Sequence, residues 1–428
     1  MRLPARLSAF SLLLTVAIPM TAAPQSSTTT DPALAHARRL LERVPLIDGH
    51  NDLPWEIRDS RTAPRDVDAY DIRQPAPKQT DLPRMAEGRV GGQFWSIYIP
   101  GEIKDSGYAR VQLEQFDIAR RMIARYPERL RFVTTAAGIE SAFKAHRVAS
   151  LLGMEGGHAI ENSLGALRAY YDLGARYMTL THNVTLDWAD AALDSARHGG
   201  LTPFGREVVH EMNRLGMIVD LSHVSPGTMS DALDASAAPV MFSHSASREL
   251  VDHPRNVPDS ILERLPKNGG VVMVTFVPAF VSPEVAAWDL SETAFRHELS
   301  PVADSGERHR RMDQWRAAHP RPRASLNQVA DHIEHVRKVA GVDHVGIGSD
   351  FDGIEDVPDG LEDSSKFPEL FAELIRRGWS DADLTKLAGG NLLRMFHQVE
   401  TIAAQLQRER PPSTKTIEQL DGPTVATP

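Results

Sequence analysis

Residues 218–244 read IVDLSHVSPGTMSDALDASAAPVMFSH and contain two apolar runs, each ending in a Ser-His pair, with a helical pattern between them. The runs Ile218–His223 and Val240–His244 are predicted strands, and Pro226–Ala235 is the predicted helix. Near-continuous apolar strands that alternate with helices are typical of a parallel sheet covered on both faces. This stretch therefore predicts an α/β fold.

The same unit recurs along the chain. Six more runs are predicted strands: Leu46–His50, Phe94–Ile99, Ser150–Glu155, Tyr177–His182, Val271–Phe276 and Val345–Asp350. Eight strands with helical patterns in most of the gaps predict a closed (β/α)8 barrel of the TIM type, and the chain of 428 residues has a suitable length. The alternative architecture is an open doubly wound sheet.

The chain divides into four predicted segments. Residues 1–23 are predicted to be a signal peptide, because Arg2 and Arg6 flank the start of an apolar stretch and small residues follow it. Residues 24–30 form a linker, residues 31–406 the barrel domain, and the polar, Pro-rich residues 407–428 a disordered tail. An exported protein, periplasmic or secreted, is therefore expected; an uncleaved membrane anchor is the alternative.

One part of the barrel domain departs from the repeat. Val281–Arg323 follows the seventh strand and is long, charged and flanked by proline. We expect a long loop at the C-terminal ends of the barrel strands. It could be a lid over a site there, an oligomer contact or plain surface decoration.

Composition excludes several functions. The formal net charge is -10 with no block of basic residues, so nucleic acid is not an expected partner. Cysteine is absent, so disulfides and thiolate metal ligands are excluded. Metal ligands are limited to His, Asp and Glu, which suit zinc, manganese or iron at a hydrolytic site.

Acidic residues and histidines gather at the ends of the predicted strands. They are His50, Asp52, Glu155, His182, His223, His244 and Asp350. The C-terminal ends of barrel strands meet on one rim, where neighbouring carboxylates would repel each other and leave buried polar groups unpaired. Two divalent cations roughly 3.5–4 Å apart, sharing a hydroxide, would remove that problem.

Two further roles stay open from spacing alone. Asp350 and Asp352 in GSDFDG are equally placed to bind metal or to transfer protons. Arg255 in HPRNVPD can clamp a carboxylate with its planar guanidinium, or can form an ordinary surface ion pair.

Seven motifs carry a family resemblance. IDGHNDLPW, GMEGGHAI, TLTHN, DLSHVS, FSHSASR, RNVPD and GIGSDFDG occur in this order between about Leu46 and Glu400. Together they resemble the renal or membrane dipeptidase family of the amidohydrolase superfamily, whose members are zinc-dependent barrel enzymes. The resemblance covers nearly the whole chain after the signal peptide.

The resemblance implies a role for each residue. His50 and Asp52 would bind one zinc ion, His223 and His244 a second, and Glu155 would bridge the two ions. His182 would contact the substrate carbonyl, and Arg255 the C-terminal carboxylate. Asp350, rather than Asp352, would exchange protons with the bridging hydroxide and the leaving amine. The implied activity is hydrolysis of dipeptides, including those with a D-residue at the C-terminal position.

Some features depart from the family pattern. Animal relatives are disulfide-linked and lipid-anchored, which this chain without cysteine should not be, and TFVPAF lacks the tyrosines found there. Homodimer formation is implied only by the resemblance. The rival functions are another amidohydrolase, such as an N-acyl amino acid deacylase or lactonase, a metal-bound but inactive interaction protein, and a periplasmic solute-binding protein.

Overall fold

The computed structural model describes residues 31–103 and 107–422. The predicted signal peptide (1–23) and linker (24–30) lie outside the described residues. Within the described part of the chain, no helix combines the length and the apolar character needed to cross a membrane.

Eight parallel strands close into a ring. They are β1 (Leu46–Asn51), β2 (Val90–Tyr98), β4 (Val148–Glu155), β5 (Ala175–Thr179), β6 (Ile218–Asp220), β7 (Met241–Ser245), β8 (Val271–Val274) and β9 (Val345–Ile347). Their order is β2-β1-β9-β8-β7-β6-β5-β4, and β4 pairs back onto β2 from Gly92↔Ala149 to Tyr98↔Glu155. Because an open sheet would keep two unpaired edges, this closure confirms the (β/α)8 barrel. The short β3 (Leu130–Phe132) is an additional strand that pairs with the start of β4.

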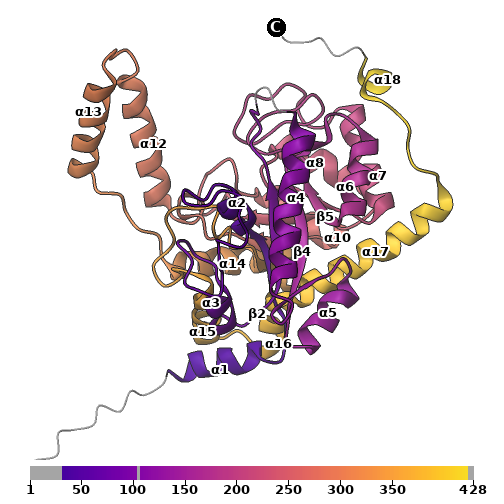
Figure 1. Cartoon of the computed structure of the whole chain (residues 1–428), viewed down its shortest axis with the longest axis horizontal. Coiled ribbons are helices and arrows are strands. Elements are labelled where there is room, and N and C mark those ends of the chain that lie inside the picture. Colours follow the sequence, from indigo (N-terminus) through magenta and orange to yellow (C-terminus); the bar gives the residue numbers. More distant parts are fainter. Residues whose placement is uncertain (1–30, 104–106, 423–428) are drawn as a thin grey trace, which may run out of the picture. The chain divides into compact units, whose positions relative to one another are not determined.

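Helices follow most strands and cover the barrel (Figure 1). The main ones are α1 (Pro32–Leu41), α2 (Leu53–Arg58), α3 (Leu82–Glu87), α4 (Tyr108–Arg125), α5 (Ala136–Lys144), α6 (Leu164–Leu173), α7 (Pro203–Leu215), α8 (Pro226–Ala235), α14 (Leu326–Ala340), α15 (Phe367–Arg376), α16 (Asp381–Thr385) and α17 (Asn391–Glu409). The segment after β7 forms two short helices, α9 (Asp259–Leu262) and α10 (Leu265–Asn268).

Local sequence sets the helix ends. Before α7 and α8, the side chains of Thr202 and Ser225 accept hydrogen bonds from backbone N–H groups in the first turn, and a proline follows each cap. Gly216 ends α7 in the left-handed conformation, which costs a residue without a side chain little. Such short, defined connections bring each strand end back to the same rim.

The interior of the barrel is filled by side chains from successive strands. Ile47, Phe94, Leu151, Tyr177 and Met273 belong to one buried apolar cluster. Tyr177 needs a glycine beside it, because a Cβ on Gly153 would lie 2.0 Å from Cζ of the tyrosine ring. The Tyr177 hydroxyl can therefore reach the floor of the catalytic rim.

The predicted long loop at 281–323 is instead mostly helical. After α11 (Pro278–Val281), α12 (Pro283–Glu298) and α13 (Ser305–Ala318) form a helical pair, drawn in orange in Figure 1. Trp315 contacts Trp288 and Phe295, with ring centroids 5.4 and 5.6 Å apart. The charged composition hides these helices from a reading of apolar periodicity. Ser282 and Asp304 nevertheless cap them with side-chain hydrogen bonds.

The structure also differs from the predicted disordered tail (407–428) over residues 407–422, and residues 423–428 lie outside the described part of the chain. Helix α17 continues to Glu409, and α18 (Ile417–Asp421) contacts α7. The Asp421 carboxylate accepts hydrogen bonds from Thr202 Oγ1 (2.6 Å) and from the backbone N–H of Phe204 (2.9 Å), while Ile417 is buried. Arg410, Ser413 and Lys415 add polar contacts to His210, Glu211 and Glu207, so several contacts with α7 order a segment whose composition is otherwise typical of disorder.

Candidate metal and catalytic site

The predicted site residues lie together at the C-terminal end of the barrel strands. His50 is in β1, Glu155 ends β4 and His244 is in β7. His182, His223 and Asp350 each lie three residues after the last residue of β5, β6 and β9, which are Thr179, Asp220 and Ile347. Asp52 directly precedes α2. All seven strand-end residues therefore share one rim, as the sequence predicts.

Glu155 is the centre of this cluster. Its Oε1 lies 3.0 Å from His223 Nε2 and 3.5 Å from His244 Nε2. Its Oε2 lies 3.4 Å from His50 Nε2, which in turn lies 3.2 Å from Asp52 Oδ2. Oε1 of Glu155 thus faces His223 and His244, whereas Oε2 faces His50 and accepts a hydrogen bond from Ser96 Oγ at 3.0 Å.

Hydrogen bonds at Nδ1 orient the three histidines. His50 Nδ1 lies 2.8 Å from the Tyr177 hydroxyl, His223 Nδ1 3.0 Å from the Asn183 side-chain oxygen, and His244 Nδ1 2.8 Å from Ser243 Oγ. With Nδ1 occupied in this way, all three Nε2 atoms point at Glu155 or at each other. Such partners fix the tautomer and ring orientation of histidine ligands in metal sites.

The donor set fits divalent cations. Three overlapping groups of three donors, His50-Asp52-Glu155, Glu155-His223-His244 and His50-His244-Asp350, each have their ligand atoms within 4.8 Å of one another. Asp52 Oδ1 is buried and has no hydrogen-bond partner among the described residues. The Nε2 atoms of His223 and His244 face each other at 2.9 Å. Imidazole nitrogens and carboxylate oxygens in this arrangement suit zinc and similar ions.

The pKa shifts of His223, His244 and Glu155 also suit metal binding. Burial, helped by the charge of Arg255, holds the pKa values of His223 and His244 well below the usual range, so both are neutral as ligands must be. Burial would raise the pKa of Glu155, but His50 and the hydrogen bond from His223 hold it well below its usual value. Burial would lower the pKa of His50, but the oxygens of Tyr177, Glu155 and Asp52 raise it well above 6.5. The surroundings of His50 thus favour a positive charge, whereas burial and the nearby Arg255 oppose one on His223 and His244.

Asp350 and Asp352 are separated by the structure. Asp350 Oδ1 lies 3.8 Å from His50 Nε2, and burial raises the pKa of Asp350 well above its usual value. Asp352 instead accepts a hydrogen bond from the backbone N–H of Gln79 at 3.0 Å. Both residues and His223 have left-handed backbone, with φ of 64°, 66° and 68°. Asp350, and not Asp352, therefore faces the candidate metal ligands.

His182 and Arg255 lie beside this cluster. His182 Nε2 is 3.8 Å from Glu155 Oε1, and burial lowers the pKa of its imidazole. Arg255 is 1% exposed, which excludes the surface ion pair that its sequence context allows. Among the described residues no carboxylate forms an ion pair with Arg255; Ser245 Oγ, at 3.5 Å, accepts its one side-chain hydrogen bond. A buried guanidinium of this kind is available to an anionic ligand.

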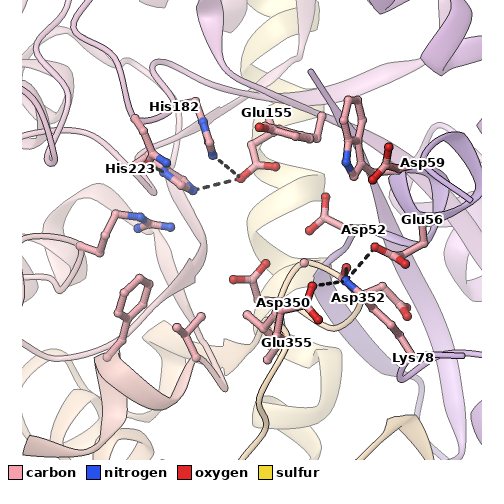
Figure 2. Close-up of a pocket in the computed structure, with 18 of the residues that line it drawn as sticks. Asp52, Glu56, Asp59, Lys78, Glu155, His182, His223, Asp350, Asp352 and Glu355 are labelled. Atoms are coloured by element: carbon pink, nitrogen blue, oxygen red, sulfur yellow. Dashed lines mark hydrogen bonds and ion pairs between the residues drawn. The ribbon is translucent and has the colours of Figure 1, made fainter. Parts of the chain in front are cut away.

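A cavity of about 450 Å³ is lined by Asp52, Glu155, His182, His223, Arg255 and Asp350. Figure 2 shows the carboxylates of Asp52, Glu155 and Asp350 around its centre, with His182 and His223 on one side. The other side carries Lys78 between acidic residues: its Nζ lies 2.8 Å from Glu56 and 3.0 Å from Glu355. The cavity lining therefore combines the buried guanidinium of Arg255 with the carboxylates of Glu56 and Glu355 around Lys78.

Sequence reasoning missed several lining residues, among them Trp55, Glu56, Lys78, Tyr98 and Asn183. Trp55 and Glu56 lie three and four residues after Asp52, Tyr98 is near the end of a predicted strand, and Asn183 directly follows His182, so a signal existed for these four. Lys78 lies in an irregular segment, and no local pattern could place it in the cavity.

Known proteins match this chain over most of its length. The sequence profile of the membrane dipeptidase family, peptidase family M19, matches residues 34–410. Dipeptidase 3 of Rattus norvegicus is 42% identical over 380 residues, covering 87% of this chain and 69% of the relative.

Two solved structures have a similar fold. A probable dipeptidase, PvdM, from Pseudomonas aeruginosa superposes with a TM-score of 0.75 at 27% identity, covering 87% of this chain and 99% of the other. A metallo peptidase from Rhodobacter sphaeroides, solved with a phosphinate mimic of the dipeptide L-Ala-D-Ala, has a TM-score of 0.69 at 24% identity and covers 83% and 99%. The chain belongs to the membrane dipeptidase family, peptidase family M19, and is a metallo-dipeptidase.

Proposed function

We propose that this metallo-dipeptidase holds two zinc ions and hydrolyses free dipeptides. His50 and Asp52 hold one ion, His223 and His244 the other, and Glu155 contributes one oxygen to each. The observation that carries this proposal is that the two carboxylate oxygens of Glu155 face different histidines: Oε1 faces His223 and His244, and Oε2 faces His50. A single ion at either group would leave the imidazoles of the other group without a cation to bind.

The protein residues divide the catalytic work. When bound, the ions supply a nucleophile from water at neutral pH and polarise the scissile carbonyl. Asp350, whose pKa is raised by burial, accepts the proton of the attacking water and passes it to the leaving amine. His182 donates a hydrogen bond to the oxyanion that develops on the carbonyl.

The charges of the cavity match a zwitterionic substrate. The C-terminal carboxylate of a dipeptide would pair with Arg255, and its N-terminal ammonium would lie towards the carboxylates of Glu56 and Glu355. In a longer peptide the second residue would present an uncharged amide to Arg255 in place of a carboxylate, and the charge pair would be lost. This supports a preference for dipeptides over longer peptides.

Substrate range, location and assembly are further parts of the proposal. L-Ala-D-Ala is a suitable test substrate, because the relative from Rhodobacter sphaeroides was solved with a mimic of that dipeptide. The export-type first 23 residues support a periplasmic or secreted enzyme. Homodimer formation stays a prediction.

Metal removal tests the proposed function directly. We expect about two zinc ions per purified chain by elemental analysis, and hydrolysis of Leu-Leu and L-Ala-D-Ala that a chelator abolishes and added zinc restores. Fewer than one zinc per chain together with chelator-resistant activity would contradict the proposal. Faster hydrolysis of N-acyl amino acids than of dipeptides would favour a deacylase instead.

Arg255→Ala should lower kcat/KM for a dipeptide by about a hundredfold or more, since losing one partner of a buried charge pair costs about 2–5 kcal/mol. The zinc content should not change, because Arg255 is not among the grouped donors. Arg255→Lys is the matched control: it keeps the charge but not the planar fork, so an intermediate loss is expected. If Arg255→Ala lowers kcat/KM for the C-terminal amide of the dipeptide as much as for the free acid, Arg255 does not bind the carboxylate.

A further inference from the structure

Asp220 is a buried carboxylate that the proposed mechanism does not use. It is the last residue of β6 and is fully buried. Its Oδ1 accepts hydrogen bonds from the backbone N–H groups of Ser222 (3.2 Å) and Ser243 (2.8 Å). Its Oδ2 accepts from Thr179 Oγ1 (2.5 Å) and Ser243 Oγ (2.7 Å). Four donors match the four lone-pair positions of an ionised carboxylate.

Ser243 connects this carboxylate to a candidate metal ligand. Ser243 Oγ lies 2.8 Å from Nδ1 of His244. The carboxylate of Asp220, at 2.7 Å, is a nearer and stronger acceptor for the single Ser243 proton than Ser222 Oγ at 3.4 Å, so the hydroxyl oxygen is left to accept the proton of His244 Nδ1. His244 is thereby held in the tautomer whose Nε2 lone pair points towards Glu155 Oε1 and His223.

The other two histidines have neutral partners. His50 Nδ1 meets the Tyr177 hydroxyl, and His223 Nδ1 meets the side-chain oxygen of Asn183. A hydroxyl can act as donor or acceptor, so the partner of His50 does not by itself dictate a tautomer. The Asp220 carboxylate, bonded to Ser243, does dictate the tautomer of His244. The two candidate metal positions therefore differ in how firmly their histidine ligands are oriented.

We propose that Asp220 is a positioning residue for the metal position shared by His223 and His244, acting on His244 through Ser243. This inference rests on the proposed function, since it assumes that the cluster binds metal. Partners that orient a ligating histidine and raise its basicity typically strengthen metal binding by about 10–100-fold. The Asp220–Ser243 pair therefore contributes affinity at this position and not at the position of His50 and Asp52.

The competing explanation is that Asp220 only ties neighbouring strands together. Asp48 provides a matched control for that role. It is equally buried, in β1, and accepts hydrogen bonds from Ser349 N–H (2.7 Å) and Ser349 Oγ (2.6 Å). It thus joins β1 to the residues after β9, but its hydrogen bond from His50 comes from the backbone N–H and not from the ring.

The test measures Zn²⁺ binding to metal-stripped full-length protein by competition with a chromophoric chelator. Asp220→Asn and Ser243→Ala should each weaken one of the two zinc equivalents by about 10–100-fold and leave the other within about threefold. Asp48→Asn should leave both equivalents within about threefold of wild type, although it lowers the melting temperature. Ser243→Thr keeps the hydroxyl group, so it should bind both zinc equivalents with nearly the affinity of the wild type.

The outcomes are separable. If Asp220→Asn and Ser243→Ala bind both equivalents as tightly as wild type, or if Asp48→Asn loses as much affinity, Asp220 is only a strand tie. Should Asp220→Asn fail to fold, Ser243→Ala decides, because it leaves Asp220 its bonds to Thr179 and to two backbone groups. If the wild-type protein itself binds no zinc, the proposed function is wrong, and not only the positioning role of Asp220.

Discussion

Glu155→Gln is expected to remove both ions and to lower dipeptide turnover by about a thousandfold or more. The two oxygens of this carboxylate serve different donor groups, one with His50 and one with His223 and His244. An amide keeps only one of these oxygens and turns an N–H₂ group towards the other donors. Elemental analysis and steady-state kinetics on the same preparation would measure both effects.

Glu211→Gln is the control for loss of a buried glutamate. Glu211, in α7, is 2% exposed and bonded to Arg214 and Arg168. Its substitution should lower stability, because it weakens a buried ion pair, and should leave the zinc content unchanged. Retention of two zinc ions by Glu155→Gln would show that Glu155 does not join the two positions.

Asp350→Asn is expected to lower kcat by about 10²–10⁴-fold, the usual contribution of a general acid–base group, while both zinc ions stay bound. Asparagine has nearly the same shape but cannot carry a proton from water to the leaving amine. Because burial favours the protonated form of Asp350, its carboxyl group is well suited to hold that proton between the two steps. Rapid-mixing and steady-state kinetics would locate the loss in the chemical step.

The neighbouring Asp352→Asn is a sharp control for this result. Burial also raises the pKa of Asp352, to about 7, and the residue lines the same cavity. Its carboxylate is nevertheless bonded to the backbone of Gln79 and not directed at His50. We expect a loss smaller than about tenfold, below the range of acid–base catalysis. An equal loss in the two variants would mean that proton transfer does not depend on Asp350 specifically.

Much of the fold and site could be predicted from local sequence. Apolar runs of strand length predicted the eight barrel strands, and the His, Asp or Glu at the end of six of them predicted the rim on which Glu155 and His244 meet; the short β3 was not predicted. The reason is physical: buried parallel strands need continuous apolar residues, and the rim is the one place where their polar termini converge.

Other features depend on contacts between distant segments and leave no local signature. The burial of Arg255 and the position of Lys78 are set by packing across the barrel. The direction of Asp350 depends on a left-handed backbone that spacing does not reveal. The order of α18 rests on Asp421 reaching α7, more than two hundred residues earlier in the chain. The helices at 283–318 are hidden by their charged composition.

The left-handed backbone at His223 and Asp350 has a consequence for the order of events during folding. A non-glycine residue in this conformation costs about 1 kcal/mol or more, and neighbouring structure must hold it there. The donors also come from segments as far apart as His50 and His244. The unfolded chain therefore cannot hold the ions in this geometry, and metal capture should follow barrel closure. Ions that bind only the closed barrel then shift the folding equilibrium towards it, so apparent stability should rise with free zinc concentration.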